Sequence, residues 1–189
     1  MRPVPAHERA QKVTAWNPLS SRTAPPPTIV SRLWPWLIAS AVWLIDQLTK
    51  AAVIASFRPG ESRPVVNGVF HLTYVQNTGS AFGLFRGATP WLVLTSLIVG
   101  AWVVVELRRP AARRFTLTTL GWALVLGGAA GNVVDRLRWG YVVDFLDLRV
   151  WPVFNVADSA ITVGVGLLLW HAYRERRPQS IDHRPQSEQ

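Results

Sequence analysis

The sequence predicts an all-α membrane protein with four transmembrane helices and a small β-structure outside the membrane. Apolar residues make up 49% of the 189 residues and charged residues only 16%, whereas soluble proteins usually have about 25% charged residues. Four apolar runs have roughly the 20-residue length of a spanning helix. A segment rich in β-branched and aromatic residues separates the first two runs.

The first predicted span covers residues 33–57, with Pro35 in the first turn, where proline is tolerated. A secretory signal peptide is the alternative, but a long tail precedes the run and two charges, Asp46 and Lys50, lie inside it. The third run is short and rich in glycine, which allows helices to approach closely in lipid. The remaining predicted spans cover residues 88–107, 115–131 and 154–173.

Between the first two spans, the segment 64–85 contains the turn signals Asn-Gly and Thr-Gly-Ser among β-branched and aromatic residues. This pattern predicts short strands and turns that lie on the membrane surface.

Basic residues orient the predicted spans, because positively charged flanks stay on the cytoplasmic side. Most of the 20 Lys and Arg residues precede the first span, separate the second from the third, or follow the fourth. Both termini are therefore expected in the cytoplasm, and residues 58–87 and 132–153 are expected outside. The predicted organisation is a disordered cytoplasmic tail (1–31), a four-helix transmembrane domain (32–175) and a second cytoplasmic tail (176–189).

Composition also excludes several kinds of site. The net charge of +9 comes from basic blocks beside apolar runs, a pattern of membrane proteins rather than of nucleic-acid binding. The absence of cysteine excludes a cysteine nucleophile, a disulfide framework and a zinc–thiolate site. The four histidines lie far apart without metal-ligand spacing, so neither a metal nor a cofactor is expected.

Polar residues interrupt the apolar pattern at a few places. Asp46 and Lys50 have i, i+4 spacing, so they share a helix face and can form an ion pair, which favours a structural role. Asn132, Asp135 and Arg136 also share one face if the third helix continues through them.

Two further carboxylates lie at the expected outer edge of the membrane. Asp158 follows Asn155 by three residues near the start of the fourth span, and it is either a helix cap or a functional group. Asp144 lies in an apolar, strand-like run, where desolvation should raise its pKa. Its alternative role is an ion pair with Arg136, Arg138 or Arg149.

The available side chains limit the chemistry. Ser80 and Ser159 have no histidine at a motif position, and a Ser–Lys dyad is disfavoured because Lys50 already has Asp46 as a partner. Two aspartates that share a proton remain, one acting as base and the other as acid.

The stretches "DQLTK", "NTGSAFG", "GNVVDRLRWGYVVDF" and "FNVADSAI", in this order, resemble signal peptidase II, the bacterial lipoprotein signal peptidase. The resemblance covers residues 33 to about 173. It implies an aspartic endopeptidase with four transmembrane helices and a small extracytoplasmic β-cradle. Such an enzyme removes signal peptides from diacylglyceryl-modified prolipoproteins by cleaving before the lipidated cysteine.

The same resemblance implies roles for particular residues. The catalytic aspartates fall on Asp144 and Asp158. Ser80 departs from the alanine that is common in the family. The positions that match supporting or substrate-binding residues are Asn77, Asn132, Arg136, Asn155, Asp46, Lys50 and Asp135.

The expected partners are diacylglyceryl-modified prolipoproteins and membrane lipid, not nucleic acid, and the expected state is a monomer. The expected location is the bacterial inner membrane, with the active site at the outer leaflet. A membrane protein that binds lipid or conducts ions is the alternative. It would place polar residues through the full depth of several spans, whereas here they cluster at the outer end.

Overall fold

A computed structural model describes residues 29–79 and 89–176. Most of both predicted tails (1–28 and 177–189), and Ser80 with the end of the predicted surface segment, lie outside the described residues. The described helices are α2 (Ile29–Ser56), α3 (Thr89–Arg108), the short 3-10 helix η2 (Pro110–Arg113), α4 (Leu117–Trp139) and α5 (Val156–Glu175). The described strands are β1 (Ser62–Val66), β2 (Phe70–Asn77) and β3 (Val142–Asp147).

The four long helices in the described ranges are long and apolar enough to cross a membrane, which confirms the predicted fold class. Many large apolar side chains point outward, among them Leu37, Leu97 and Leu169. In water this exposure would be unfavourable, whereas in a bilayer these side chains meet lipid tails.

Helix α4 lies at the centre and packs against α2, α3 and α5. Its glycines allow this close approach: a Cβ on Gly128 would collide with the carbonyl oxygen of Ala157, and Gly121 and Gly164 face each other across the α4–α5 contact. The glycine-rich composition of this span is therefore a packing feature.

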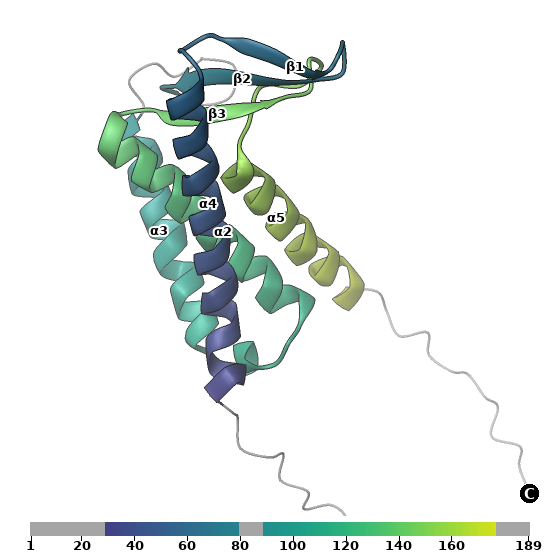
Figure 1. The fold of residues 1–189 in the computed structure, drawn as a ribbon. Helices are drawn as coiled ribbons and strands as arrows, with labels where there is room; N and C mark the ends of the chain where they lie inside the picture. Colours follow the sequence, from purple (N-terminus) through teal and green to yellow (C-terminus); the bar gives the residue numbers. More distant parts are fainter. Residues whose placement is uncertain (1–28, 80–88, 177–189) are drawn as a thin grey trace, which may run out of the picture.

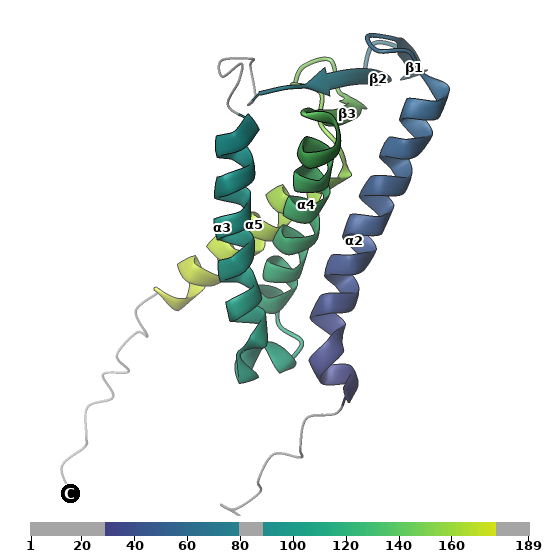
Figure 2. The same ribbon diagram turned by 90° about the vertical axis from the view of Figure 1, so that its left-hand side faces the viewer.

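The three strands form one antiparallel sheet in the order β1-β2-β3, which caps one end of the helices (Figures 1 and 2). A cluster of Val53, Tyr74, Val143 and Phe145 packs the sheet against the end of α2. The start of α2 and the end of α5 lie at the opposite end (Figure 1). The predicted strands in segment 64–85 are confirmed as far as Asn77.

Two predicted boundaries were wrong. Helix α4 continues to Trp139 instead of ending at Gly131, because its polar side chains find partners on α2 and α5, and it stops at Gly140, whose φ of 76° suits glycine. Residues 132–139 are therefore helical and not part of an outer loop. Helix α2 begins at Ile29, so Pro35 lies in its second turn rather than its first.

Candidate active site

Asp144 and Asp158 come from different elements at the sheet end of the bundle. Asp144 lies in β3, a strand that is buried along most of its length. Asp158 lies in the first turn of α5, where the β3–α5 connection returns the chain beneath the sheet. The two carboxylates lie close enough that the charge on Asp158 raises the pKa of Asp144.

Asn155 connects the two aspartates. Its Nδ2 donates a 2.7 Å hydrogen bond to Oδ1 of Asp144, and its Oδ1 accepts a 2.9 Å bond from the backbone N–H of Asp158. Oδ2 of Asp158 accepts a hydrogen bond in return from the backbone N–H of Asn155. These reciprocal bonds form a capping box at the start of α5. Asn155 is thus the N-cap of α5 and Asp158 is the N3 residue of its capping box, whose other oxygen is left for Asn132.

Two more asparagines hold the remaining carboxylate oxygens. Asn132 of α4 donates a 2.7 Å hydrogen bond to Oδ1 of Asp158. Asn77 donates a 2.9 Å bond to Oδ2 of Asp144. The sheet register explains this contact: Asn77 pairs with Val142, so Asp144 is its diagonal neighbour on the same face.

A buried cluster of charged side chains holds Asn132 in place. Lys50 Nζ lies 2.8 Å from Oδ2 of Asp46 and 2.8 Å from Oδ2 of Asp135, and it donates a 3.0 Å hydrogen bond to Oδ1 of Asn132. The predicted Asp46–Lys50 pair is confirmed, and Asp135 from α4 joins it. Because Oδ1 of Asn132 accepts from Lys50, its amide group is left to face Asp158.

The two acidic members of this cluster also tie elements together. Asp46 of α2 accepts a 2.9 Å hydrogen bond from the backbone N–H of Ala157 at the start of α5. Asp135 accepts a 3.1 Å bond from the backbone N–H of Val143 in β3. The cluster therefore fixes β3, which carries Asp144, and α5, which carries Asp158, against α2 and α4.

The pKa of Asp144 is strongly raised. Burial, and then the charge on Asp158, raise its pKa from 3.8 to about 7, although the hydrogen bonds from Asn77 and Asn155 act in the opposite direction. Near neutral pH this carboxyl can hold a proton, which is the property required of a general acid.

A cavity of about 380 Å³ opens beside Asp158. Its walls are mainly apolar, and they come from the β3–α5 connection and from the outer face of α5. The residues that contribute are Leu148, Trp151, Phe154, Asp158, Ser159, Thr162 and Val163. A carboxylate at the wall of an apolar cavity can act on a polar bond within a largely apolar ligand.

The family described as Signal peptidase (SPase) II matches the chain over residues 38–174, a range that includes both aspartates. The chain belongs to the signal peptidase II family. It is therefore a membrane-spanning peptidase, and the aspartic type fits this family.

Sequence relatives of this chain include the lipoprotein signal peptidase of Moorella thermoacetica, 51% identical over 139 residues, which are 71% of this chain and 89% of the relative. The enzyme of Nostoc sp. is 45% identical over 153 residues, 79% of this chain and 94% of the relative. A solved structure described as a bacterial membrane enzyme structure, by the in meso method at 2.3 Å resolution, is similar with a TM-score of 0.70 at 28% identity. That likeness covers 78% of this chain and 93% of the solved chain.

Arg136 is the remaining residue that the sequence singled out. Its side chain on α4 interacts electrostatically with Asp158, Asp144 and Asp135. Within the described ranges it makes no ion pair, so its charge is available to a further group. The predicted alternative of an Arg149 ion pair with Asp144 was wrong, because Arg149 pairs with Asp147 at 3.1 Å.

The Ser–Lys alternative gains no support from the geometry. Ser159 Oγ donates its hydrogen bond to the carbonyl oxygen of Asn155, and Lys50 is held by Asp46 and Asp135. Among the described residues no group of three or more histidines and carboxylates could hold a metal ion.

Gln47 belongs to the site's support but was missed in the sequence. Its Nε2 donates a 3.0 Å hydrogen bond to Asp135 and a 3.3 Å bond to Asp46. The available signal was its position beside Asp46 in a span where polar residues are expensive. Its partner Asp135 lies 88 residues away, which no local pattern reveals.

Proposed function

We propose that this chain removes signal peptides from diacylglyceryl-modified prolipoproteins by cleaving before the lipidated cysteine, with Asp144 and Asp158 as the catalytic pair. The observation that carries the proposal is the asparagine frame, which holds the two carboxylates together and leaves Asp158 at the wall of an apolar cavity. Relatives that share about half of the sequence are called lipoprotein signal peptidases, and this supports the substrate class.

The raised pKa of Asp144 supports the assignment of the two roles. In this mechanism Asp144 holds the proton at rest, and Asp158 is the general base. Water attacks the scissile carbonyl carbon and gives a proton to Asp158. Asp144 then protonates the amine nitrogen of the lipidated cysteine as the C–N bond breaks. The products are a free signal-peptide carboxylate and a new α-amino group.

Asn77, Asn132 and Asn155 position the two carboxylates, and the cluster of Asp46, Lys50 and Asp135 keeps these asparagines in place. Arg136, whose charge faces both aspartates, binds a polar group of the lipid-modified substrate. The acyl chains lie in the bilayer beside the apolar cavity, where each buried CH₂ group contributes about 0.8 kcal/mol.

The proposed orientation places the sheet end and the aspartates at the outer leaflet of the inner membrane. Its support is the basic residues at the opposite end of the helices, among them Arg108, Arg109 and Arg174. Both termini are then cytoplasmic. A monomer suffices, because both aspartates and their hydrogen-bond partners come from one chain.

The test is a cleavage assay on purified protein in detergent, with a diacylglyceryl-modified prolipoprotein and its unlipidated form as substrates. We expect the wild type to cut only the lipidated form, and folded Asp144→Asn and Asp158→Asn variants to be inactive. Asp147→Asn is the matched control, because Asp147 lies on the same strand but bonds to Thr73 and Arg149 instead. Near-normal cleavage by either folded dyad variant would contradict the mechanism. A wild type that cuts neither form would favour a lipid-binding or ion-conducting protein.

A further inference from the structure

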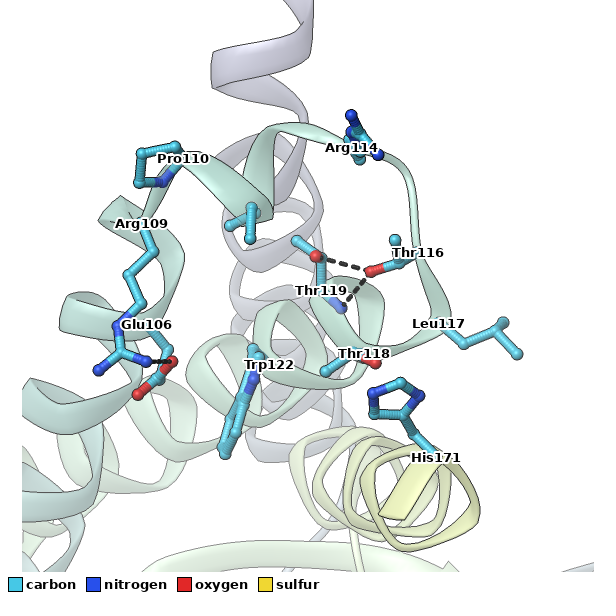
Figure 3. A pocket seen from close by; sticks show the side chains of 12 residues that line it. Glu106, Arg109, Pro110, Arg114, Thr116, Leu117, Thr118, Thr119, Trp122 and His171 are labelled. Carbon is cyan, nitrogen blue, oxygen red and sulfur yellow. Dashed lines mark hydrogen bonds and ion pairs between the residues drawn. The ribbon is translucent and has the colours of Figure 1, made fainter. Parts of the chain in front are cut away.

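A second cavity, of about 750 Å³, lies at the end of the bundle opposite the aspartates, and Figure 3 shows the side chains that line it. It is lined by the end of α3, by η2, by the first turns of α4 and by one residue of α5. The side chains that matter for its chemistry are Glu106, Arg109, Arg114, Thr118, Trp122 and His171. The proposed peptidase mechanism uses none of them.

The cavity is cationic. Arg109 Nη1 pairs with Oε2 of Glu106 at 3.1 Å, and the Arg109 side chain stays 62% exposed, so it can contact another group. Arg114 is exposed and, among the described residues, makes no ion pair. Among the lining residues one guanidinium is therefore uncompensated, because Glu106 is their only carboxylate and Glu175, outside the lining, lies 3.2 Å from His171. Guanidinium groups bind phosphate oxygens through paired hydrogen bonds.

Threonine side chains, which are neutral hydrogen-bond donors, also line the cavity wall. Figure 3 shows Thr116, Thr118 and Thr119 between the Arg109–Glu106 pair and His171. The Thr116 and Thr119 side chains bond to each other at 2.9 Å, whereas the Thr118 hydroxyl has no hydrogen-bond partner in the described part of the chain. The positive end of the α4 dipole adds to the attraction for an anion.

The location indicates where such an anion comes from. Three apolar helices begin or end at this cavity, which places it at the level of lipid headgroups. Trp122, Leu117 and Ala112 provide apolar wall beside the charged residues. We propose that this cavity binds the phosphodiester group of an anionic phospholipid from the leaflet at this end of the bundle. A zwitterionic lipid carries the same phosphate, but its cation would meet the arginines.

The test uses the purified full chain in nonionic detergent, with unfolding followed by the fluorescence of its ten tryptophans. The protein is titrated with short-chain phosphatidylglycerol, with short-chain phosphatidylcholine, and with inorganic phosphate alone. Arg114→Gln and Thr118→Val are the test variants. Arg174→Gln is the matched control, because Arg174 is also an exposed arginine near this end but does not line the cavity.

We expect phosphatidylglycerol to raise the melting temperature most, and Arg114→Gln to weaken its apparent affinity about tenfold, as expected for loss of a charge-assisted hydrogen bond. Thr118→Val should weaken it less, and Arg174→Gln should bind like the wild type. Native mass spectrometry of retained lipid provides a second readout that does not depend on melting. If inorganic phosphate stabilised the protein as much as phosphatidylglycerol does, a lipid would be overturned as the source of the bound phosphate group. Equal stabilisation by phosphatidylcholine, or undiminished binding by Arg114→Gln, would overturn the site.

Discussion

Asn155 and Asp144 are joined by a 2.7 Å hydrogen bond, and the same asparagine caps the helix that carries Asp158. One fully buried side chain therefore has two separable duties: it starts α5, and it holds the carboxyl that we propose as the acid. The two roles can be tested separately, because a residue with a shorter side chain can still cap α5 but cannot reach Asp144.

Asn155→Ser should keep the cap, since serine is a good N-cap residue, but its side chain is too short to reach Asp144. Asn155→Ala should lose both functions and be about 1 kcal/mol less stable than the serine variant. Both variants should cut at least about tenfold more slowly, because the Asp144 carboxyl loses a hydrogen bond. Their pH profiles should also move upward, since that bond lowers the pKa of Asp144. Melting curves and cleavage rates measure the two effects, and a serine variant with wild-type cleavage would show that the contact is structural only.

The pH dependence of stability should report the raised pKa of Asp144. The folded protein keeps a proton on this carboxyl up to about pH 7, whereas an unfolded chain loses it near its ordinary value of 3.8. Wild-type stability should therefore fall as pH rises from about 4 to about 7, and then level off. Asp144→Asn cannot titrate, so its melting temperature relative to the wild type should rise over that window.

Asp147→Asn is the control for this experiment. Burial raises the pKa of Asp147, but hydrogen bonds from Thr73 and Arg149 outweigh burial and leave the pKa below 3.8. Asp147 therefore changes stability only below about pH 5, and the difference between this variant and the wild type should be constant from about pH 5 to 7. A flat difference for Asp144→Asn as well would mean that Asp144 is ionised throughout.

Removing the cation of the buried cluster should destabilise the protein strongly. Lys50→Met leaves Asp46 and Asp135 buried without a cation, which costs about 3–5 kcal/mol. The triple variant that adds Asp46→Asn and Asp135→Asn removes the uncompensated charges and should recover much of the loss. Unfolding in detergent measures all three proteins. A triple variant no more stable than Lys50→Met would show that packing of the lysine stem, not charge, is what matters.

Glycine packing on α4 gives a test of the helix contacts. Gly128→Ala would place a methyl group against the carbonyl oxygen of Ala157 and the side chain of Ile161, and overpacking of this kind costs about 1–3 kcal/mol. Gly166→Ala is the matched control, because nothing lies within 4 Å of its added Cβ. It should be neutral or slightly stabilising, since alanine favours helix. Equal melting temperatures for the two variants would contradict the close α4–α5 approach.

The spans, the sheet strands and the Asp46–Lys50 pair were all predictable, because each depends on residues that are neighbours in sequence. A span is set by the hydropathy of about 20 successive residues, and an ion pair at i, i+4 by helix geometry alone. The end of α4 was not predictable in this way. Hydropathy falls at Asn132 and Asp135, and only their partners on α2 and α5 allow the helix to continue.

The candidate site was likewise predictable from the sequence only in part. Local patterns identified Asp144 and Asp158 as unusual carboxylates in apolar surroundings, and left open whether each was a cap, an ion-pair partner or a reactive group. Which oxygen each asparagine holds depends on contacts between residues 11 to 67 positions apart, and the cation that Asp135 meets is supplied by another helix. Such contacts form only when β2 pairs with β3 and α4 packs against α2 and α5, because no backbone geometry within a single element can bring those atoms together.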